Sequence, residues 1–267
     1  MLNNRFKNEI NIWLIFSLVA TFLVILPISS IWYAALDVDS RVWNHIYKYL
    51  FLGFSINTLI LVLGVALLTT ILGVTAAWLI AFENFYFRKI LSYLLIFPIA
   101  IPPYAVAYCY ADITDKGGLL SNFMELVNIS QFDIFVPSVR SIPGVIFVLS
   151  ITLFPYVYLI TRYSFEFNSR KIIEAATNLG ISNKKLFFKC SLPLARPAII
   201  AGLALVIMET MSDFGVVHYL GVDSLSVGIY KSWFGLGDFN SSARLATILF
   251  IFAFFTLFLE NLLRNKK

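Results

Sequence analysis

Two carboxylates within an apolar stretch are the side chains of this sequence best placed to do chemistry. Glu209 and Asp213 lie four positions apart in the segment 197–217, so a helix would carry both on one face. An ionised carboxylate in a bilayer is costly and usually faces a bundle interior or a water-filled cavity. Together with Ser212, the pair predicts a polar lining of a translocation route. The alternative, left equally open, is that Asp213 ends the helix at the membrane surface and Glu209 bonds to a neighbouring helix.

Other reactive residue types are few and scattered. His45 and His218 are the two histidines, and neither has a metal-ligand spacing such as H-x₃₋₅-H. Cys109 lies in an apolar segment and Cys190 in a basic one, so they imply no disulfide framework. The sequence has no Walker A loop, so we expect a non-catalytic chain that binds no ATP and has no cofactor of its own. The metal ligands, if any, stay unknown. An intramembrane enzyme built on the carboxylate pair is an alternative that would need a facing partner.

The composition indicates that these residues are held by membrane-spanning helices. Of the 267 residues, 60% are hydrophobic and 13% are charged, whereas a soluble domain has about 25% charged residues. The net charge of +5 does not indicate nucleic-acid binding, because Lys and Arg flank apolar stretches and do not form one patch. We therefore expect an all-α integral membrane protein in contact with membrane lipid and not with nucleic acid.

Six apolar stretches are each close to the length of about 20 residues that a helix needs to cross the hydrocarbon core. The third contains Pro98, Pro102 and Pro103, so its helix must be kinked or broken. The first is too long for a signal peptide and is expected to be a span. The whole chain, residues 1–267, is expected to form a single transmembrane domain. The expected spans are about 12–35, 55–81, 90–112, 142–161, 197–217 and 244–263.

The basic residues predict the orientation of these spans. If the six spans alternate in direction, fourteen of the 20 basic residues fall on one side of the membrane. Loops rich in Lys and Arg are cytoplasmic by the positive-inside rule. We therefore expect a multi-pass protein of the cell inner membrane with both termini in the cytoplasm. The six basic residues on the outer side are Arg41, Lys48, Lys116, Arg140, Lys231 and Arg244.

The segment 168–196 is the long basic loop between the fourth and fifth spans, and it has an internal pattern. Apolar residues at helical spacing are followed by Gly180, which ends a helix cheaply in the left-handed conformation. Ser182 is placed to cap a second short helix with Leu186 on its apolar side, and Pro193 closes the stretch. Two short amphipathic helices around a glycine, at a membrane face, predict a docking element for another protein.

This pattern resembles the EAA loop of the permeases of ABC importers. In that family the loop is the coupling element that seats in a groove of the cytoplasmic ATPase. One position departs from the family pattern, because Cys190 stands where an aliphatic residue is usual, and Cys packs as a small hydrophobe. The resemblance implies six helices of the MetI-like type and assigns a coupling role to Glu174, Ala175, Ala176, Gly180, Leu186, Leu192 and Pro193.

Three further runs, residues 97–112, 209–215 and 228–234, look like those of iron(III)-type permeases, close to the first half of a two-part permease chain. The resemblance implies ferric iron as cargo. Permeases for thiamine, sulfate or polyamines share the loop and the general layout and stay as alternatives. The residues expected to line the translocation path are Glu209, Ser212, Asp213, Pro102, Pro103 and Tyr104.

The chain departs from the iron-class pattern by containing one six-helix half. A separate chain supplies the second half, the sequence is a fragment, or two copies pair with C₂ symmetry. The resemblance implies as partners an ABC ATPase dimer, which binds ATP and Mg²⁺, a second permease half or copy, and an extracytoplasmic substrate-binding protein. A secondary transporter or channel is the rival class. Such proteins use broken helices at their ion sites, but they do not need the cytoplasmic helix pair around a glycine.

Overall fold

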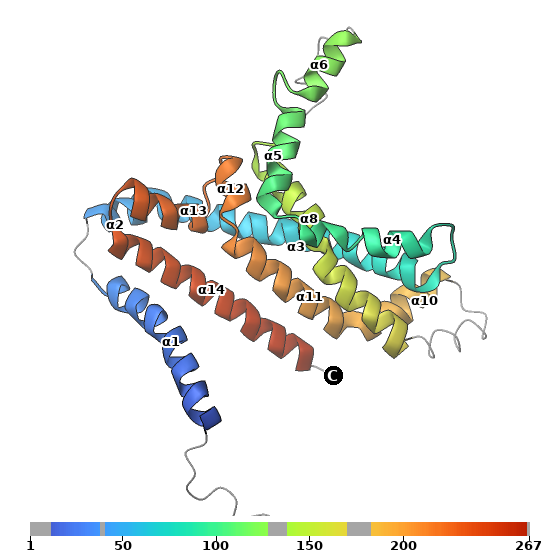
Figure 1. Ribbon diagram of the computed structural model, residues 1–267, viewed down its shortest axis with the longest axis horizontal. Coiled ribbons are helices and arrows are strands. Elements are labelled where there is room, and N and C mark those ends of the chain that lie inside the picture. The colour runs from blue at the N-terminus through green and yellow to red at the C-terminus, as the bar shows by residue number, and fades with distance from the viewer. Residues whose placement is uncertain (1–11, 38–40, 128–137, 170–182, 266–267) are drawn as a thin grey trace, which may run out of the picture.

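The computed structural model describes residues 12–37, 41–127, 138–169 and 183–265, and within these ranges the chain is helical with short connections and no strand. Four long helices, α3, α8, α11 and α14, form an elongated bundle (Figure 1). Helices α5 and α6 rise away from one side of this bundle, and α1 lies along its margin beside α14.

The N-terminal helices are long and apolar. Helix α1 buries none of its side chains within this chain, so its surface is available to lipid or to another subunit. The 32 residues of α3 correspond to about 48 Å, which exceeds the hydrocarbon core of about 30 Å, so α3 extends beyond the bilayer. The elements are α1 (Ile12–Ala35), α2 (Arg41–His45), the π-helical η1 (Ile46–Leu50) and α3 (Phe51–Phe82).

The third apolar stretch is broken, as its prolines predict. Its two helical parts, Arg88–Ala100 and Pro103–Leu126, meet at an angle of 96°. Ile101 at the break is extended (φ −101°, ψ 125°) because a proline disfavours the helical conformation of the residue before it. Pro103 then occupies the first turn of the next helix, where its missing N–H costs nothing. The elements are α4 (Arg88–Leu94), η2 (Phe97–Ala100), α5 (Pro103–Thr114) and α6 (Leu119–Leu126).

The C-terminal half supplies the other long helices. Ser141 caps α8 by accepting a hydrogen bond from the Gly144 N–H at 3.3 Å. Among the residues that the structure describes, five helices are long and apolar enough to cross a membrane, and the bent pair raises this to six if it is one span, in agreement with the expected number of spans. The elements are α8 (Ile142–Tyr163), η3 (Ser164–Ser169), α10 (Asn183–Leu186), η4 (Phe187–Ser191), α11 (Leu192–Ser212), α12 (Gly215–Tyr219), α13 (Leu225–Tyr230), η5 (Lys231–Gly235) and α14 (Phe239–Asn265).

The fifth span differs from its expected bounds of 197–217. Helix α11 begins at Leu192, directly after the π-helical turn Phe187–Ser191. It ends at Ser212, because Asp213 adopts an extended conformation (ψ 120°). Pro197 lies inside the helix and does not interrupt it. The helix therefore ends at Ser212, five residues before the expected end of the fifth span.

The core lies where α3, α8 and α11 meet, and two glycines allow their backbones to approach closely. A Cβ atom added at Gly73 of α3 would lie 2.8 Å from the Cβ of Val157 on α8 and 3.0 Å from the backbone N of Tyr158. A Cβ added at Gly202 of α11 would lie 2.9 Å from the Cα of Val157. Small residues at such crossings are how helices pack tightly in a membrane. Val157 is therefore held between two helices that bear no side chain at the point of contact.

Candidate coupling and translocation site

The basic segment is described at its two flanks. Glu174, Ala175, Ala176 and Gly180, the central residues of the expected coupling loop, lie outside the described residues. The segment before them ends in η3, and the chain is described again from α10 onward. The site can therefore be built from the elements that hold the two ends of the loop.

The second flank packs against the end of α3. Leu186 is 3% exposed and packs with Trp78, Phe82 and Cys190. The ring of Phe187 lies edge-on to Trp78 at a centroid distance of 5.0 Å. These contacts agree with the expected place of Leu186 on the apolar side of the second short helix, and with Cys190 as a small packing residue.

The first flank joins the same aromatic cluster. Phe165 of η3 is fully buried and contacts both Trp78, at a centroid distance of 5.9 Å, and Phe82, at 5.7 Å. Aromatic pairs at these separations add to the stability from buried area, by about 0.5–1.5 kcal/mol each. We call Trp78, Phe82, Phe165 and Phe187 the flank cluster. It fastens both ends of the basic segment to one end of α3.

A polar chain runs beside the flank cluster. Arg162 donates from Nε to Glu166 at 2.8 Å and from Nη1 to the Tyr158 hydroxyl at 3.0 Å. The Tyr158 hydroxyl in turn donates to the carbonyl of Ser92 at 3.3 Å. This chain of hydrogen bonds links the end of α8 to α4. The segment before the coupling loop is thereby tied to the first half of the broken third span.

The start of α11 is continuous with the second flank. Helices α10, η4 and α11 follow one another without a gap from Asn183 to Ser212. Ser191 in the π-helical turn donates to the carbonyl of Leu186 at 3.4 Å. Leu192 and Pro193 begin α11 in this run. Because Pro193 has no N–H and its ring crowds the preceding turn, a locally widened helix is a reasonable way to carry the chain past it.

The two carboxylates of α11 have different environments. The Oδ1 atom of Asp213 accepts hydrogen bonds from the Val216 N–H at 2.9 Å and the Val217 N–H at 3.3 Å, so this side chain caps α12. Glu209 is exposed, and its carboxylate forms no hydrogen bond or ion pair with the described residues. Ser212 donates to the carbonyl of Met208 at 3.0 Å, within its own helix.

The break in the third span lies beside α12. Tyr104, in the first turn of α5, packs against Gly215, where an added Cβ would lie 3.0 Å from the Cβ of Tyr104. Pro102 and Pro103 set the start of α5 and so the position of Tyr104. The structure thus brings the expected path residues of α5 close to the segment that follows Asp213.

An outer cluster that sequence reasoning missed holds this region together. Arg140 forms an ion pair with Asp115 at 2.9 Å, donates to the Tyr219 carbonyl at 3.1 Å and lies 5.0 Å from the centre of the Tyr219 ring. The hydrogen bond to Asp115 raises the pKa of the Arg140 guanidinium. The ring of Tyr108 contacts that of Tyr219 at 4.0 Å. No local signal marks Arg140, because its partners are 25 and 79 positions away.

Two polar side chains near the start of α3 form hydrogen bonds with the backbone at the start of α13. Asn57 donates to the carbonyl of Asp223 at 2.8 Å, and Thr58 accepts from the Leu225 N–H at 3.0 Å.

The two histidines are in aromatic surroundings: His218 stacks on Phe214 at 4.8 Å, and His45 lies 5.1 Å from Tyr49. Within the part of the chain that the structure describes, no group of three His, Cys, Asp or Glu residues could hold a metal ion.

The helical bundle, with its broken third span and a basic loop packed at both flanks, defines the class as a multi-pass helical membrane protein. The chain belongs to the family described as binding-protein-dependent transport system inner membrane component, whose model matches residues 69–265. The family assignment confirms the ABC importer permease resemblance and the inner-membrane, MetI-like fold expected from it.

Curated relatives cover most of the chain. It is 25% identical to the molybdenum transport system permease protein ModB of Haemophilus influenzae, over 73% of this chain and 85% of that protein. It is also 25% identical to the sulfate transport system permease protein CysT of Salmonella typhimurium, over 78% of this chain and 75% of that protein. The spermidine/putrescine transport system permease protein PotB of Haemophilus influenzae is 25% identical over 100% of this chain and 98% of that protein. None of these three is an iron permease, so they do not support the narrower iron-class resemblance.

A solved structure shares the fold. A chain of a bacterial alginate ABC transporter, crystallised with an alginate pentasaccharide-bound periplasmic protein, aligns with a TM-score of 0.74 over 95% of this chain and 94% of that one. The sequence identity is 14%, so this likeness concerns the fold alone. These relatives are permease subunits, which agrees with a non-catalytic role for this chain.

Proposed function

We propose that this chain is the membrane-spanning permease subunit of an ATP-driven importer and that the segment 168–196 couples a cytoplasmic ATPase to α11. The observation that carries the proposal is the uninterrupted helical run from Asn183 to Ser212. Leu186 near its start is clamped by the flank cluster, and Glu209 lies 23 residues further on, about 35 Å along the axis. Because a helix is stiff along its axis, a displacement at the loop is carried to Glu209.

The proposed assembly has three further components. A dimeric ABC ATPase docks on the coupling loop through Glu174, Ala175, Ala176 and Gly180 and binds ATP and Mg²⁺, whereas this chain needs no cofactor. A second permease half, or a second copy, completes the path with two-fold symmetry. An extracytoplasmic binding protein delivers the cargo; the solved relative's periplasmic protein and the family description support this partner. Both termini lie in the cytoplasm in this arrangement.

The proposed path runs beside Glu209 and the start of α5. The exposed carboxylate of Glu209 makes no bond within the described chain, so it is available to line a space shared with the second half. Pro102, Pro103 and Tyr104 lie where the broken third span meets α12, and Ser212 lies one turn from Glu209. Asp213 has a different role from Glu209, because its carboxylate caps α12, and it shapes the path through that helix.

The proposed cargo is a small, multiply charged solute. The names of the relatives indicate molybdenum, sulfate and spermidine or putrescine. Molybdate, sulfate and these polyamines are multiply charged, as ferric iron is. Ferric iron is the hypothesis that the three sequence runs support, and thiamine is a further alternative. Cells with and without the chain can be compared for uptake of radiolabelled ferric ion, molybdate, sulfate, spermidine and thiamine. Dependence of one of these on the chain identifies the cargo, and independence of all five contradicts the proposed class.

The assembly is tested by affinity purification of the tagged chain in mild detergent. Co-purification of an ABC ATPase and of a second permease half, or of a second copy, is the expected result. The Glu174→Arg variant should lose the ATPase while it keeps the second half, because the substitution reverses charge only in the docking loop. Uptake by the chain without any ATPase would favour a secondary transporter.

A further inference from the structure

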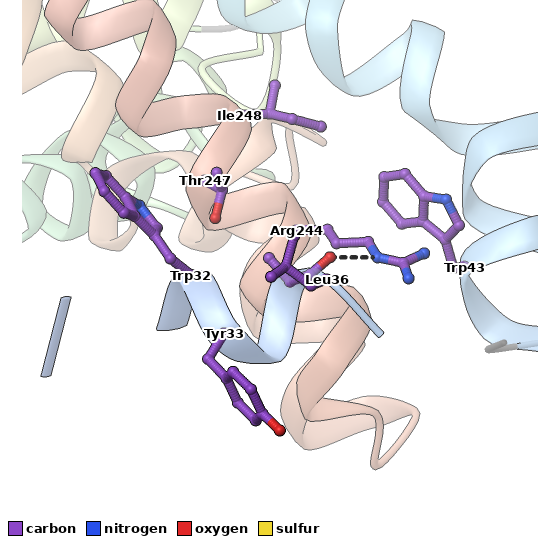
Figure 2. Close-up of a pocket in the computed structure, with 8 residues that line it drawn as sticks. Trp32, Tyr33, Leu36, Trp43, Arg244, Thr247 and Ile248 are labelled. Atoms are coloured by element: carbon purple, nitrogen blue, oxygen red, sulfur yellow. Dashed lines mark hydrogen bonds between the residues drawn. The ribbon is translucent and has the colours of Figure 1, made fainter. Parts of the chain in front are cut away.

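A buried arginine at the junction of α1, α2 and α14 is not used by the coupling loop or by the proposed path. Arg244, in the second turn of α14, is 9% exposed. Its Nε donates to the carbonyl of Ala35 at 3.0 Å, and its guanidinium lies 5.0 Å from the centre of the Trp43 ring (Figure 2). Nη2 is buried and has no hydrogen-bond partner in the part of the chain that the structure describes.

The charge of Arg244 is not balanced by an acid among the described residues. No ion pair to Arg244 occurs in those parts of the chain. The carboxylate of Asp37, two residues after Ala35 in the chain, accepts a hydrogen bond from Asn240 at 2.6 Å. A guanidinium has five N–H donors, and among the described residues only the Nε donor has a hydrogen-bond acceptor. A buried charged donor with no partner among the described residues is costly, so this site favours an anionic acceptor.

Arg244 lines a cavity whose other walls are apolar and aromatic. The cavity is about 640 Å³, within the range of about 300–1,000 Å³ that is usual for small-ligand sites. In Figure 2 its lining side chains surround Arg244, with Trp32 and Tyr33 on the α1 side and Thr247 and Ile248 above it on α14. The lining residues are Trp32, Tyr33, Ala35, Leu36, Trp43, Arg244, Thr247 and Ile248.

The position of the cavity identifies the environment of the anion. It lies where α1 ends and α14 begins, and Trp and Tyr side chains are enriched at this level of a bilayer because their rings match the headgroup region. Basic pockets between transmembrane helices bind anionic headgroups on the cytoplasmic side, and the same pairing of a cation with a phosphate applies at the outer surface. The planar donors of arginine match a phosphate in two-point contact. The apolar walls suit the first part of an acyl chain.

We propose that the cavity between α1, α2 and α14 is a binding site for the phosphodiester of an anionic glycerophospholipid, with Arg244 as its cationic residue. The bound lipid joins α1, which buries no side chain within this chain, to the bundle through α14. With the proposed orientation, the lipid belongs to the outer leaflet. The ligand chemistry is a phosphate oxyanion, and its source is a membrane lipid rather than free phosphate.

The test measures phosphatidylglycerol binding to the purified, delipidated permease complex by native mass spectrometry. Arg244→Gln should weaken binding by roughly tenfold to a hundredfold, the ratio expected for the loss of a charge-assisted hydrogen-bonded pair. Arg41→Gln is the matched control, because Arg41 is exposed in the same region and does not line the cavity. Its binding should equal that of the wild type.

A second variant keeps the test decisive if Arg244→Gln does not fold. Thr247→Phe adds a ring to the cavity wall and retains the bond from Arg244 to Ala35, so it should also weaken phosphatidylglycerol binding. Inorganic phosphate at the same concentrations should neither bind nor displace the lipid. Unchanged lipid binding in either folded variant, no saturable binding by the wild type, or displacement by inorganic phosphate would each overturn the assignment.

Discussion

Replacing Gly73 by alanine should destabilise the bundle, although alanine is the better helix former. The added Cβ would lie 2.8 Å from the Cβ of Val157, whereas carbon atoms prefer about 3.5–4.0 Å. Helices α3 and α8 must therefore separate by about 0.7–1.2 Å at this point. Such overpacking costs about 1–3 kcal/mol, and the helix preference of alanine returns about 0.5–1 kcal/mol. We expect a net loss of up to about 2.5 kcal/mol, with a central value of about 1 kcal/mol, or about fivefold in the unfolding equilibrium.

The assay is reversible unfolding of the purified protein by SDS in mixed micelles, followed by circular dichroism. Gly53→Ala is the matched control on the same helix, because no atom lies within 4 Å of its added Cβ. This control should be as stable as the wild type or more stable. If Gly73→Ala is as stable as the wild type, the close approach of α3 and α8 at Gly73 does not contribute to the stability of the bundle.

Second-site variants distinguish backbone contact from side-chain crowding. At Gly64, also on α3, the three atoms nearest to the added Cβ would all be side-chain atoms of Ile146, the nearest at 2.5 Å. Ile146→Ala should therefore remove the penalty of Gly64→Ala in a double-mutant cycle. Val157→Ala should not rescue Gly73→Ala, because the Val157 Cβ and the Tyr158 backbone N, 3.0 Å away, both remain. Full rescue would refute the backbone explanation.

Three further predictions concern the coupling loop, the path and the outer cluster. Glu174→Arg and Gly180→Val should each uncouple ATP hydrolysis from uptake without loss of membrane insertion; normal substrate-stimulated ATPase and uptake in both would contradict the coupling role. Glu209→Gln should reduce uptake and leave the free energy of unfolding unchanged. Asp213→Ala should lower the free energy of unfolding by about 0.5–2 kcal/mol, because the α12 cap is lost. If transport and unfolding assays show the reverse pattern, the roles given to the two carboxylates are wrong. Asp115→Asn should change stability by less than about 1 kcal/mol, because its ion pair with Arg140 is solvent-exposed; a larger loss in the unfolding assay would count against this estimate.

The sequence by itself determined the membrane class, the six apolar stretches and the broken third span. These features follow from local properties: the length of apolar runs, and the inability of Pro102 and Pro103 to continue a helix. The motif in the basic loop also indicated the permease family, which the comparison with residues 69–265 confirmed. The narrower iron assignment did not gain support, because cargo choice depends on few residues within a layout that many permeases share.

Only the tertiary structure decided which side chains meet. In the sequence, Glu209 and Asp213 look like two equivalent carboxylates four positions apart on one helix. In the structure α11 ends at Ser212, so Glu209 lies on the helix and is exposed, whereas Asp213 lies beyond its end and caps α12. Residues far apart in the chain meet in the flank cluster, in the packing of Gly73 and Gly202 against Val157, and around the buried Arg244. Such contacts depend on how helices cross, and helix crossings are set by the shapes of whole surfaces, which no local pattern of residues encodes.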